Sequence, residues 1–288
     1  MIIILMQLII IFWKALCSFP RKQHPVIAIL LGKILYFTAV KRRKIANANI
    51  QLCFPDSPSE EKIRLLKDNF YFLGSSVFDT GIAWFWSDER IQKSLSYEIK
   101  GLDNLKLNKG GVGNLILFKH SQHLELDARI LALNAPIYGV ERSHNSNFMN
   151  NLQTKGRLSS MKETADKNNP RSFIKWLKEG KNVLYAIDQD YGWENSTKLK
   201  FFDQDVATIT TTSKIIDITK CNLLFINSYY RSKKLLLELE LTNVKGLNSK
   251  ELAQMINNLM EDKILKHPAE YLWAHRRFKS TLGKGFYT

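Results

Sequence analysis

One stretch, residues 114–132, constrains the fold of this chain more than any other. It begins with the apolar run 115–118, which follows a glycine-rich segment and therefore predicts a buried strand. Residues 124–132 place apolar side chains at helical spacing with charged residues between them, which predicts a helix. His120 lies in the turn between the two. Because open α/β sheets bind ligands beyond the carboxyl ends of their strands, this turn is the predicted functional edge.

Two histidine–carboxylate pairs can form around this turn. His123 and Asp127 are four residues apart, so they share a face of the predicted helix. His120 and Glu125 are five residues apart. They would lie about 140° apart around a regular helix, so they can meet only if His120 precedes the helix. Geometry alone therefore favours His123 with Asp127, although this could be no more than a surface helix pair. Each histidine could equally be a polar residue without a catalytic role.

The rest of the chain alternates predicted strands and helices. Further strands are expected at 136–140, 182–187, 222–229 and 235–241, and helices at 147–153, 173–178, 207–220 and 249–266. This alternation indicates an α/β fold, with a mostly parallel mixed sheet flanked by helices. Asp188 and Asp190 follow the strand at 182–187, so they are expected at the same kind of edge as His120. At 288 residues, the chain is expected to hold one large domain beyond its N-terminal segment.

The first 40 residues predict a membrane anchor. Residues 1–13 are almost wholly apolar, and residues 26–40 form a second apolar run. A helix of about 13 residues spans roughly 20 Å, short of the ~30 Å hydrocarbon core of a bilayer. No acidic residue precedes Asp56, whereas eight lysines and arginines do, which favours a cytoplasmic position for this basic flank. We therefore divide the chain into an anchor, 1–40, and a domain, 41–288; the alternative for the anchor is a buried core helix.

Net charge and cysteine content limit the kinds of function that this chain can have. The net charge of +15 at pH 7 suits an anionic membrane surface, a nucleic acid or an acidic protein partner. The densest basic run, 41–44, adjoins the apolar N-terminus, which favours a membrane over a nucleic acid. Cys17, Cys53 and Cys221 stand singly, so a reducing compartment fits and no disulfide framework is expected. The side chains at 120–127 include metal-ligand types, but H-E-x-x-H is absent and we expect no metal.

Several segments together carry a family resemblance. The motif His-x-x-x-x-Glu follows the apolar run at 115–118, and six other segments lie in the expected order: 41–44 (Lys-Arg-Arg-Lys), 49–55 (Asn-Ile-Gln-Leu-Cys-Phe-Pro), 83–86 (Ala-Trp-Phe-Trp), 153–157 (Gln-Thr-Lys-Gly-Arg), 188–192 (Asp-Gln-Asp-Tyr-Gly) and 271–279 (Tyr-Leu-Trp-Ala-His-Arg-Arg-Phe-Lys). With these segments the chain resembles the late acyltransferases of lipid A biosynthesis, which are related to the glycerolipid acyltransferases. The resemblance runs nearly from end to end.

The resemblance implies an enzyme of the Gram-negative bacterial inner membrane. It would be single-pass or monotopic, with its catalytic domain on the cytoplasmic side. The implied acyl donor is acyl carrier protein. The implied acceptor is the 3-hydroxyl of an acyl chain on the Kdo-bearing lipid A precursor, and no cofactor or nucleic acid is implied.

The family motif assigns His120 as general base and Glu125 as the carboxylate that orients it. Because the chain has no G-x-S-x-G and no cysteine near the motif in sequence, we expect direct attack of the acceptor hydroxyl on the thioester. The resemblance also carries a functional role to Arg157, which would bind a phosphate or the developing charge. Asp188 matches a functional family aspartate and would fix Arg157.

Finer assignments rest on single segments. Glu125 and the segment 275–277 resemble the lauroyl-type enzyme more than the myristoyl-type one. Arg276 and Arg277 could contact lipid phosphates or the carrier protein. The alternatives are a myristoyl-type enzyme, an acyltransferase with another lipid acceptor and, from a different class, a membrane-bound nucleic-acid-binding module.

Overall fold

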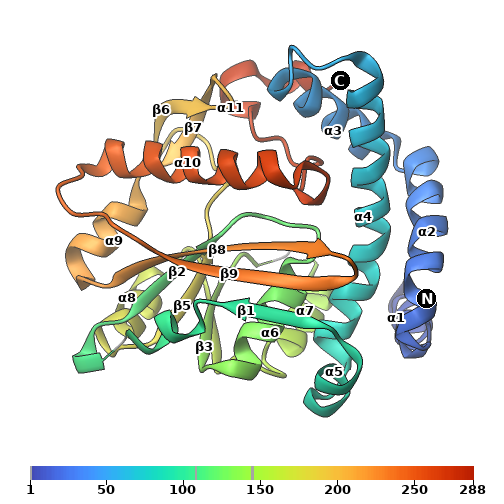
Figure 1. Ribbon diagram of the computed structural model, residues 1–288, viewed down its shortest axis with the longest axis horizontal. Coiled ribbons are helices and arrows are strands. Elements are labelled where there is room, and N and C mark those ends of the chain that lie inside the picture. The colour runs from blue at the N-terminus through green and yellow to red at the C-terminus, as the bar shows by residue number, and fades with distance from the viewer. Residues whose placement is uncertain (1, 108, 144–145) are drawn as a thin grey trace.

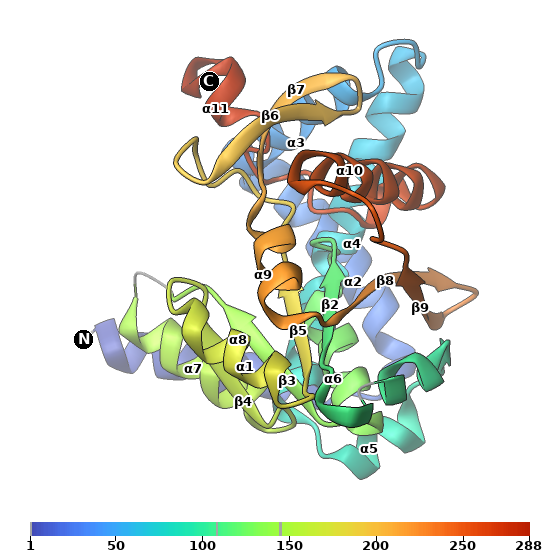
Figure 2. The same cartoon turned by 90° about the vertical axis from the view of Figure 1, so that its left-hand side faces the viewer.

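A seven-stranded sheet forms the centre of the molecule, with helices on both faces (Figures 1 and 2). The computed structural model describes residues 2–107, 109–143 and 146–288. The strand order is β1-β9-β8-β2-β5-β3-β4, and every neighbouring pair is parallel except β8 with β9. The predicted α/β fold with a mostly parallel mixed sheet is therefore confirmed. The strands are β1 (Tyr97–Lys100), β2 (Asn114–Phe118), β3 (Ile137–Glu141), β4 (Glu163–Asp166), β5 (Asn182–Ala186), β8 (Asn222–Arg231) and β9 (Lys234–Thr242).

The helices surround this sheet, and a separate antiparallel ribbon lies beyond it. The ribbon consists of β6 (Ser196–Phe201) and β7 (Gln204–Ile209). The helices are α1 (Ile2–Ser18), α2 (His24–Thr38), α3 (Val40–Cys53), α4 (Ser59–Phe85), α5 (Asp88–Ser94), α6 (Leu124–Asn134), α7 (Asn147–Arg157), α8 (Pro170–Lys178), α9 (Thr211–Thr219), α10 (Ser249–Lys266) and α11 (Lys279–Leu282). Short 3₁₀ turns include η1 (Arg21–Gln23) and η4 (Pro268–Glu270).

The sheet separates two hydrophobic layers because alternate side chains of a strand point to opposite faces. In β2, Leu115 and Leu117 join the layer that contains residues of α3, α8, α9 and α10. Ile116 and Phe118 join the layer that contains residues of α5 and α6. All five residues of β2 are buried, as expected for a central parallel strand that is covered on both faces. The strand that precedes His120 is therefore packed on both faces.

Three asparagines lie side by side across the amino ends of the central strands. Asn114 of β2 pairs in register with Asn182 of β5 and Asn222 of β8. The Asn114 side-chain amide donates to the Asn182 side-chain oxygen at 2.8 Å, and its own side-chain oxygen accepts from Asn222 at 2.9 Å. Asn114 and Asn182 are buried, so a shifted register would leave buried amide groups unpaired.

Helices α3 and α4 hold the segment that follows α10 against the end of the central strand. Asn49 of α3 and Asn69 of α4 each donate two hydrogen bonds of 2.7 Å to backbone carbonyls of the segment 269–275. The backbone N–H of Leu272 then donates to the carbonyl of His120 at 2.9 Å. The turn after β2 is thus fixed from the C-terminal part of the chain as well as from the sheet.

The N-terminal helices form a bent pair beside α4 (Figure 1). The segments Ile4–Ser18 and Arg21–Thr38 meet at an angle of 100°. A Cβ atom at Gly74 of α4 would lie only 2.3 Å from the carbonyl oxygen of Ala28, so glycine permits this close packing. Large apolar side chains remain exposed along both helices, among them Leu5, Leu8, Phe12, Phe19, Val26, Leu30 and Phe37.

This arrangement leaves the predicted membrane anchor unconfirmed. Within the described residues, the two bent segments reach the length and apolar character of a membrane span only when they are taken together. The alternative of a buried core helix fits only part of the pair, since Cys17 and Ala28 are buried whereas the residues named above are exposed. An anchor at 1–40 stays a prediction.

The helix predicted at 207–220 is wrong over its first residues. Gln204–Ile209 forms β7, which pairs antiparallel with β6, and the helix begins only at Thr211. The β-branched residues of this segment suit a strand. The connecting residues Phe202 and Asp203 have φ values of 50° and 57° without a glycine, so the sequence lacks the usual hairpin signal.

Candidate active site

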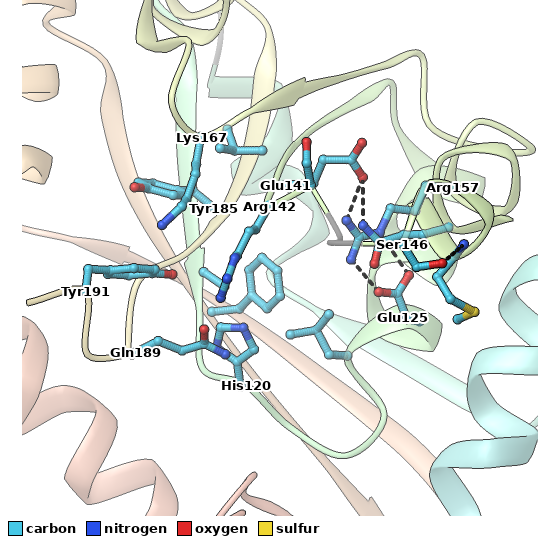
Figure 3. Close-up of a pocket in the computed structure, with 17 residues that line it drawn as sticks. His120, Glu125, Glu141, Arg142, Ser146, Arg157, Lys167, Tyr185, Gln189 and Tyr191 are labelled. Carbon is cyan, nitrogen blue, oxygen red and sulfur yellow. Dashed lines mark hydrogen bonds and ion pairs between the residues drawn. The ribbon is translucent and has the colours of Figure 1, made fainter. Parts of the chain in front are cut away.

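A pocket of about 610 Å³ opens beyond the carboxyl ends of four adjacent strands (Figure 3). The strands β2, β5, β3 and β4 each deliver at least one lining residue just after they end: His120, Gln189, Arg142 and Lys167 respectively. Ligands in open α/β sheets bind at this position. The predicted functional edge therefore coincides with a real cavity.

Asp188, and not Glu125, is the carboxylate that holds His120. Nδ1 of His120 is hydrogen-bonded to Oδ1 of Asp188, and the backbone N–H of His120 donates to Oδ2 at 2.9 Å. The two residues meet because β2 and β5 pair in parallel, and each residue follows its strand by the same distance along the chain. Burial alone would raise the pKa of Asp188, but its contacts with His120 outweigh burial and lower it. The predicted pairing of His120 with Glu125 is therefore wrong in geometry.

The other ring nitrogen of His120, Nε2, is available on the pocket side. It makes no hydrogen bond to any residue in the described part of the chain, and the side chain is 20% exposed. His275 lies within electrostatic reach of the same ring, and burial together with the charge of His120 lowers the pKa of His275 to about 4. His120 thus has one nitrogen fixed by a carboxylate and one that a substrate can reach.

Glu125 is held by Arg157. The guanidinium donates from Nη2 to Oε1 at 2.5 Å and from Nε to Oε2 at 3.1 Å, and the indole of Trp84 donates to Oε2 at 2.9 Å. Arg157 also donates from Nη1 to Glu141 at 2.7 Å. Burial would raise the pKa of Glu125, but Arg157 outweighs it and lowers that pKa. Glu125 therefore lines the pocket as a carboxylate with both oxygens engaged.

The two predicted carboxylate roles are thus exchanged. Asp188 was expected to fix Arg157 and Glu125 to orient His120; the structure places Asp188 on His120 and Glu125 on Arg157. The helix α6 does begin after His120, as the predicted pair required, but Arg157 and Trp84 reach Glu125. The catalytic role of each residue stays a prediction.

Helix α7 approaches the site through a glycine. A Cβ atom at Gly156 would lie 2.4 Å from the ring of Trp84, so only glycine allows α7 to pack there. The helix continues through Gly156 to Arg157, whereas the sequence suggested that it would end near 153. This extension is what brings the guanidinium to Glu125.

Two further cations face the pocket. Arg142 and Lys167 line it, and neither forms an ion pair with any residue that the structure describes. The Nζ of Lys167 lies 3.8 Å from the ring centroid of Tyr191, and burial lowers the pKa of this lysine. The pocket therefore combines a histidine with an open ring nitrogen, carboxylates paired with cations or the histidine, and cations that are available to an anionic group.

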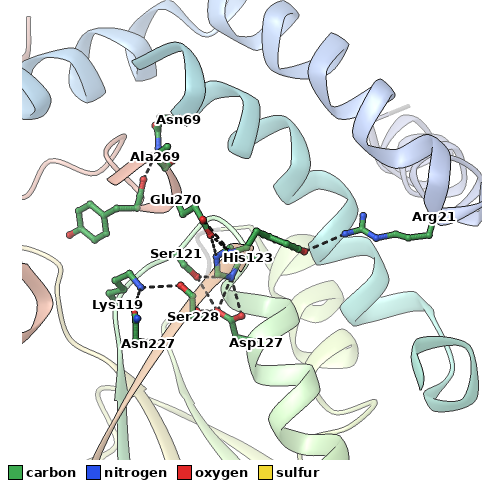
Figure 4. Close-up of polar contacts among 12 residues, drawn as sticks. Arg21, Asn69, Lys119, Ser121, His123, Asp127, Asn227, Ser228, Ala269 and Glu270 are labelled. Carbon is green, nitrogen blue, oxygen red and sulfur yellow. Dashed lines mark hydrogen bonds and ion pairs between the residues drawn. The ribbon is translucent and has the colours of Figure 1, made fainter. Parts of the chain in front are cut away.

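His123 forms a different, buried cluster behind the turn (Figure 4). Its Nδ1 donates to both carboxylate oxygens of Asp127 at 2.9 and 3.0 Å, and its Nε2 donates to Glu270 at 2.8 Å. Burial alone would lower the pKa of His123, but the two carboxylates raise it to about 10. The side chains of His123 and Asp127 are only 1% and 6% exposed, so the predicted surface helix pair is in fact buried.

The neighbouring residues Arg276 and Arg277 have different environments: Arg277 is buried and Arg276 is partly exposed. Arg277 is 3% exposed and donates to the carbonyl of Ala207 at 2.8 Å and to the hydroxyl of Thr208 at 3.1 Å. It therefore ties the C-terminal segment to β7, and its predicted contact with phosphates or a carrier protein is wrong. Arg276 stays partly exposed, 5.9 Å from the ring centroid of Tyr287, and its role stays a prediction.

The structure also describes the surroundings of the candidate metal ligands and of Asp190. Within the described residues, no group of three or more His, Cys, Asp or Glu side chains is arranged to hold a metal ion. Asp190 accepts from the backbone N–H of Ser280 at 2.7 Å and from its hydroxyl at 2.6 Å, so it positions the chain near the C-terminus.

Sequence reasoning missed several residues around the site, including Arg142 and Lys167, which line the pocket. Glu141, which binds Arg157, ends the strand β3, so the rule that located His120 could also have found it. Trp84 lies in the segment 83–86 that contributes to the family resemblance, but nothing in that segment predicted its contact with Glu125. Glu270 reaches the site region from a distant part of the chain, and no local pattern marked it. Their roles depend on tertiary packing.

Comparisons with known proteins identify the family. The family model described as bacterial lipid A biosynthesis acyltransferase matches residues 1–280. The lipid A biosynthesis palmitoleoyltransferase of Escherichia coli (strain K12) is 33% identical over 266 residues, covering 89% of this chain and 86% of that protein. The lauroyltransferase of the same strain is 33% identical over 268 residues with the same coverage. A lipid A biosynthesis acyltransferase of Haemophilus influenzae is 34% identical over 248 residues, 83% of this chain and 78% of its own. The chain therefore belongs to the bacterial lipid A biosynthesis acyltransferases, and it is an acyltransferase.

Proposed function

We propose that this enzyme transfers a lauroyl-type acyl group from acyl carrier protein to the 3-hydroxyl of an acyl chain on the Kdo-bearing lipid A precursor. The observation that carries the proposal is the His120–Asp188 pair at the mouth of the strand-end pocket, with Nε2 of His120 open to a substrate. A hydroxyl acceptor needs such a base to become a nucleophile.

The geometry supports a direct transfer. Asp188 accepts a hydrogen bond from the proton-bearing Nδ1 of His120. The lone pair of Nε2 is then free to take the proton of the acceptor hydroxyl. The hydroxyl oxygen then forms a bond to the thioester carbonyl carbon, and the carbon–sulfur bond breaks. The proton held on His120 passes to the departing sulfur, which restores the base. Asp188 stabilises the imidazolium in between.

Arg157 supports this chemistry through Glu125 in our proposal. Its donors point to Glu125 and Glu141, so it fixes one wall of the pocket beside the base. Arg142 and Lys167, which lack ion-pair partners in the described chain, are better placed to bind an anionic part of donor or acceptor.

The acyl group is the finer part of the proposal. The named relatives include a lauroyltransferase and a palmitoleoyltransferase at the same 33% identity. Palmitoleoyl transfer is therefore the second candidate. The two differ in the length and unsaturation of the acyl chain that the same donor type presents.

A competition between donors tests the function. The purified enzyme receives lauroyl, palmitoleoyl and myristoyl thioesters of acyl carrier protein together with the lipid A precursor, and mass spectrometry reads the acylated product. Preferred lauroyl transfer supports the proposal, and preferred palmitoleoyl transfer selects the second candidate. No transfer from any carrier-protein thioester, with transfer from coenzyme A thioesters instead, overturns the proposed donor. Binding to nucleic acid but not to acyl carrier protein would favour the other class of function.

We also propose that α1 and α2 lie against the cytoplasmic face of the inner membrane. The support is the run of exposed apolar side chains on both helices, together with the basic flank of 41–44. Deletion of 1–19 would also remove Trp13 and Cys17, which pack on α4, so point variants test the idea better. Leu8→Gln with Phe12→Gln should release the protein from membranes. Unchanged membrane binding in high salt would place the anchor elsewhere.

A further inference from the structure

A second cavity, of about 620 Å³, lies apart from the active-site pocket and shares no lining residue with it. It is lined by the bend between α1 and α2, by α4, by the segment 94–97 between α5 and β1, by α6 and by the ends of β8 and β9. Nothing in the acyl-transfer chemistry described above uses this cavity. Its lining nevertheless combines charge and apolar surface in a defined pattern.

Three cations stand around the cavity. Arg21 and Lys22 come from the bend between the N-terminal helices, and Lys233 comes from the turn between β8 and β9. Neither lysine forms an ion pair within the described chain, and both are exposed. Arg21 is held in place: its Nη2 donates to the hydroxyl of Tyr230 at 3.3 Å and lies 3.6 Å from Asp79. The mouth therefore carries more positive than negative charge.

The inner wall of the cavity is apolar. Its partly exposed apolar residues include Phe72 of α4 and Leu95, which follows α5. Leu126, Ile130 and Leu235 also line it but are at most 2% exposed. Serine hydroxyls from Ser75, Ser94 and Ser96 add polar groups to the same lining. A ligand that fits must therefore pair an anionic group with a hydrocarbon part.

The position of the cavity indicates where such a ligand comes from. Pro25 lines it, and Val26, the next residue, is 70% exposed on the apolar side of α2. Phe19, two residues before Arg21, is 46% exposed. The basic mouth therefore adjoins the apolar surface that we assign to the membrane.

We propose that this cavity binds a single anionic membrane lipid, with its phosphate between Arg21, Lys22 and Lys233 and the start of an acyl chain against Phe72 and Leu95. Arg21 is the anchor of the site, because Tyr230, Asp79 and His24 contact its two terminal nitrogens and leave Nε without a partner among the described residues, as a donor for a phosphate. The lipid is a fixed component of the binding face, and it is neither acyl donor nor acceptor.

A titration with monomeric lipid tests the site without a membrane surface. The full chain in detergent is titrated calorimetrically with dihexanoyl phosphatidylglycerol, dihexanoyl phosphatidylcholine and inorganic phosphate. We expect one phosphatidylglycerol per chain, at least tenfold weaker binding of phosphatidylcholine, and no measurable binding of phosphate. Equal affinity for inorganic phosphate would show that the apolar wall plays no part and would overturn the lipid assignment.

Matched variants locate the site. Arg21→Gln with Lys22→Gln and Lys233→Gln should weaken phosphatidylglycerol binding at least tenfold. Lys214→Gln with Lys245→Gln and Lys250→Gln removes the same charge from exposed positions near α9 and α10, away from the cavity, and should change affinity less than threefold. Equal losses of phosphatidylglycerol affinity in both triple variants would mean that binding depends only on net charge, and this would overturn the proposal.

A neutral variant completes the test. Ser75→Trp fills the cavity without a change of charge and should abolish binding of the single lipid. His120→Ala lies in the other pocket and should bind phosphatidylglycerol as the wild type does, so the outcome is independent of acyl transfer. Wild-type lipid binding by Ser75→Trp, with native folding shown by circular dichroism, would overturn the proposal.

Discussion

His120 and His123 are near neighbours in sequence, yet the fold gives them opposite environments. His120 has one carboxylate partner, Asp188, and its side chain is 20% exposed at the pocket. His123 has two, Asp127 and Glu270, and is 1% exposed. A ring with a free nitrogen can exchange a proton with a substrate, whereas a ring held between two buried carboxylates stays an imidazolium. The comparison indicates that a histidine–carboxylate contact alone does not mark a candidate base; a second ring nitrogen open to the pocket is also needed.

The largest effect should follow from loss of the pocket-facing pair. His120→Ala should lower the rate of acyl transfer by roughly 100- to 10,000-fold, the usual effect of losing a general base. Asp188→Ala should cause a large loss as well, and the two losses should not multiply because base and orienter act together. Steady-state rates of both single variants and the double variant check this. Near wild-type turnover of His120→Ala would remove the base from the mechanism.

A smaller loss of transfer rate is expected from changes to Arg157 and Glu125, which form another wall of the pocket. Arg157→Lys keeps the charge but cannot reproduce the two hydrogen bonds to Glu125, since lysine lacks the planar fork. We expect a loss in rate of roughly tenfold, which corresponds to about 1.4 kcal/mol, and a similar loss for Glu125→Gln. A thermal-unfolding measurement beside each assay separates misfolding from impaired transfer. Wild-type rates in both variants would mean that this cluster is only structural.

The buried cluster should respond in stability more than in rate. His123→Gln leaves two buried carboxylates without their cation and should destabilise the fold by about 3–5 kcal/mol. Correctly folded protein should keep a transfer rate within roughly tenfold of the wild type. Urea unfolding of both proteins, with rates measured well below the transition, checks the two statements. A rate loss as large as that of His120→Ala, in folded protein, would break the comparison.

The stabilising effect of His123 should also depend on pH in a defined direction. Its pKa is about 10 in the folded protein, above the ordinary value of roughly 6.5 for an unfolded chain. Its contribution is therefore complete below about pH 6.5. It is lost as the pH rises through about 10. The difference in unfolding free energy between wild type and His123→Gln should shrink over this interval. A difference that grows with pH would contradict the imidazolium.

The smallest effect is expected from chelation. Both ring nitrogens of His123 and one of His120 bind carboxylates, and no metal-binding group is found among the described residues. Exhaustive treatment with EDTA should leave the transfer rate unchanged. If activity were lost on chelation and restored by one divalent ion, the residues around His120 and His123 would have to be interpreted as a metal site.

The sequence predicted the architecture better than the contacts. Periodicity located β2, α6, β5 and α10, and strand ends located the edge where His120 and Asp188 lie. The partners of Glu125 could not be predicted, because Trp84 and Arg157 reach it from α4 and α7 through tertiary packing. The sequence also could not tell that His123 is buried, since Glu270 approaches from the far end of the chain. Local patterns report which face of an element is apolar, but not which distant residue covers it.

The asparagine row at the amino ends of the strands has a consequence for the alignment of His120 with Asp188. His120 follows Asn114, and Asp188 follows Asn182, by the same number of residues along two parallel strands. If β2 and β5 paired with the register shifted by one residue, the amides of Asn114 and Asn182 would be separated. At the carboxyl ends of the same strands, His120 and Asp188 would also be misaligned. The paired amides therefore favour the same register that brings His120 and Asp188 together.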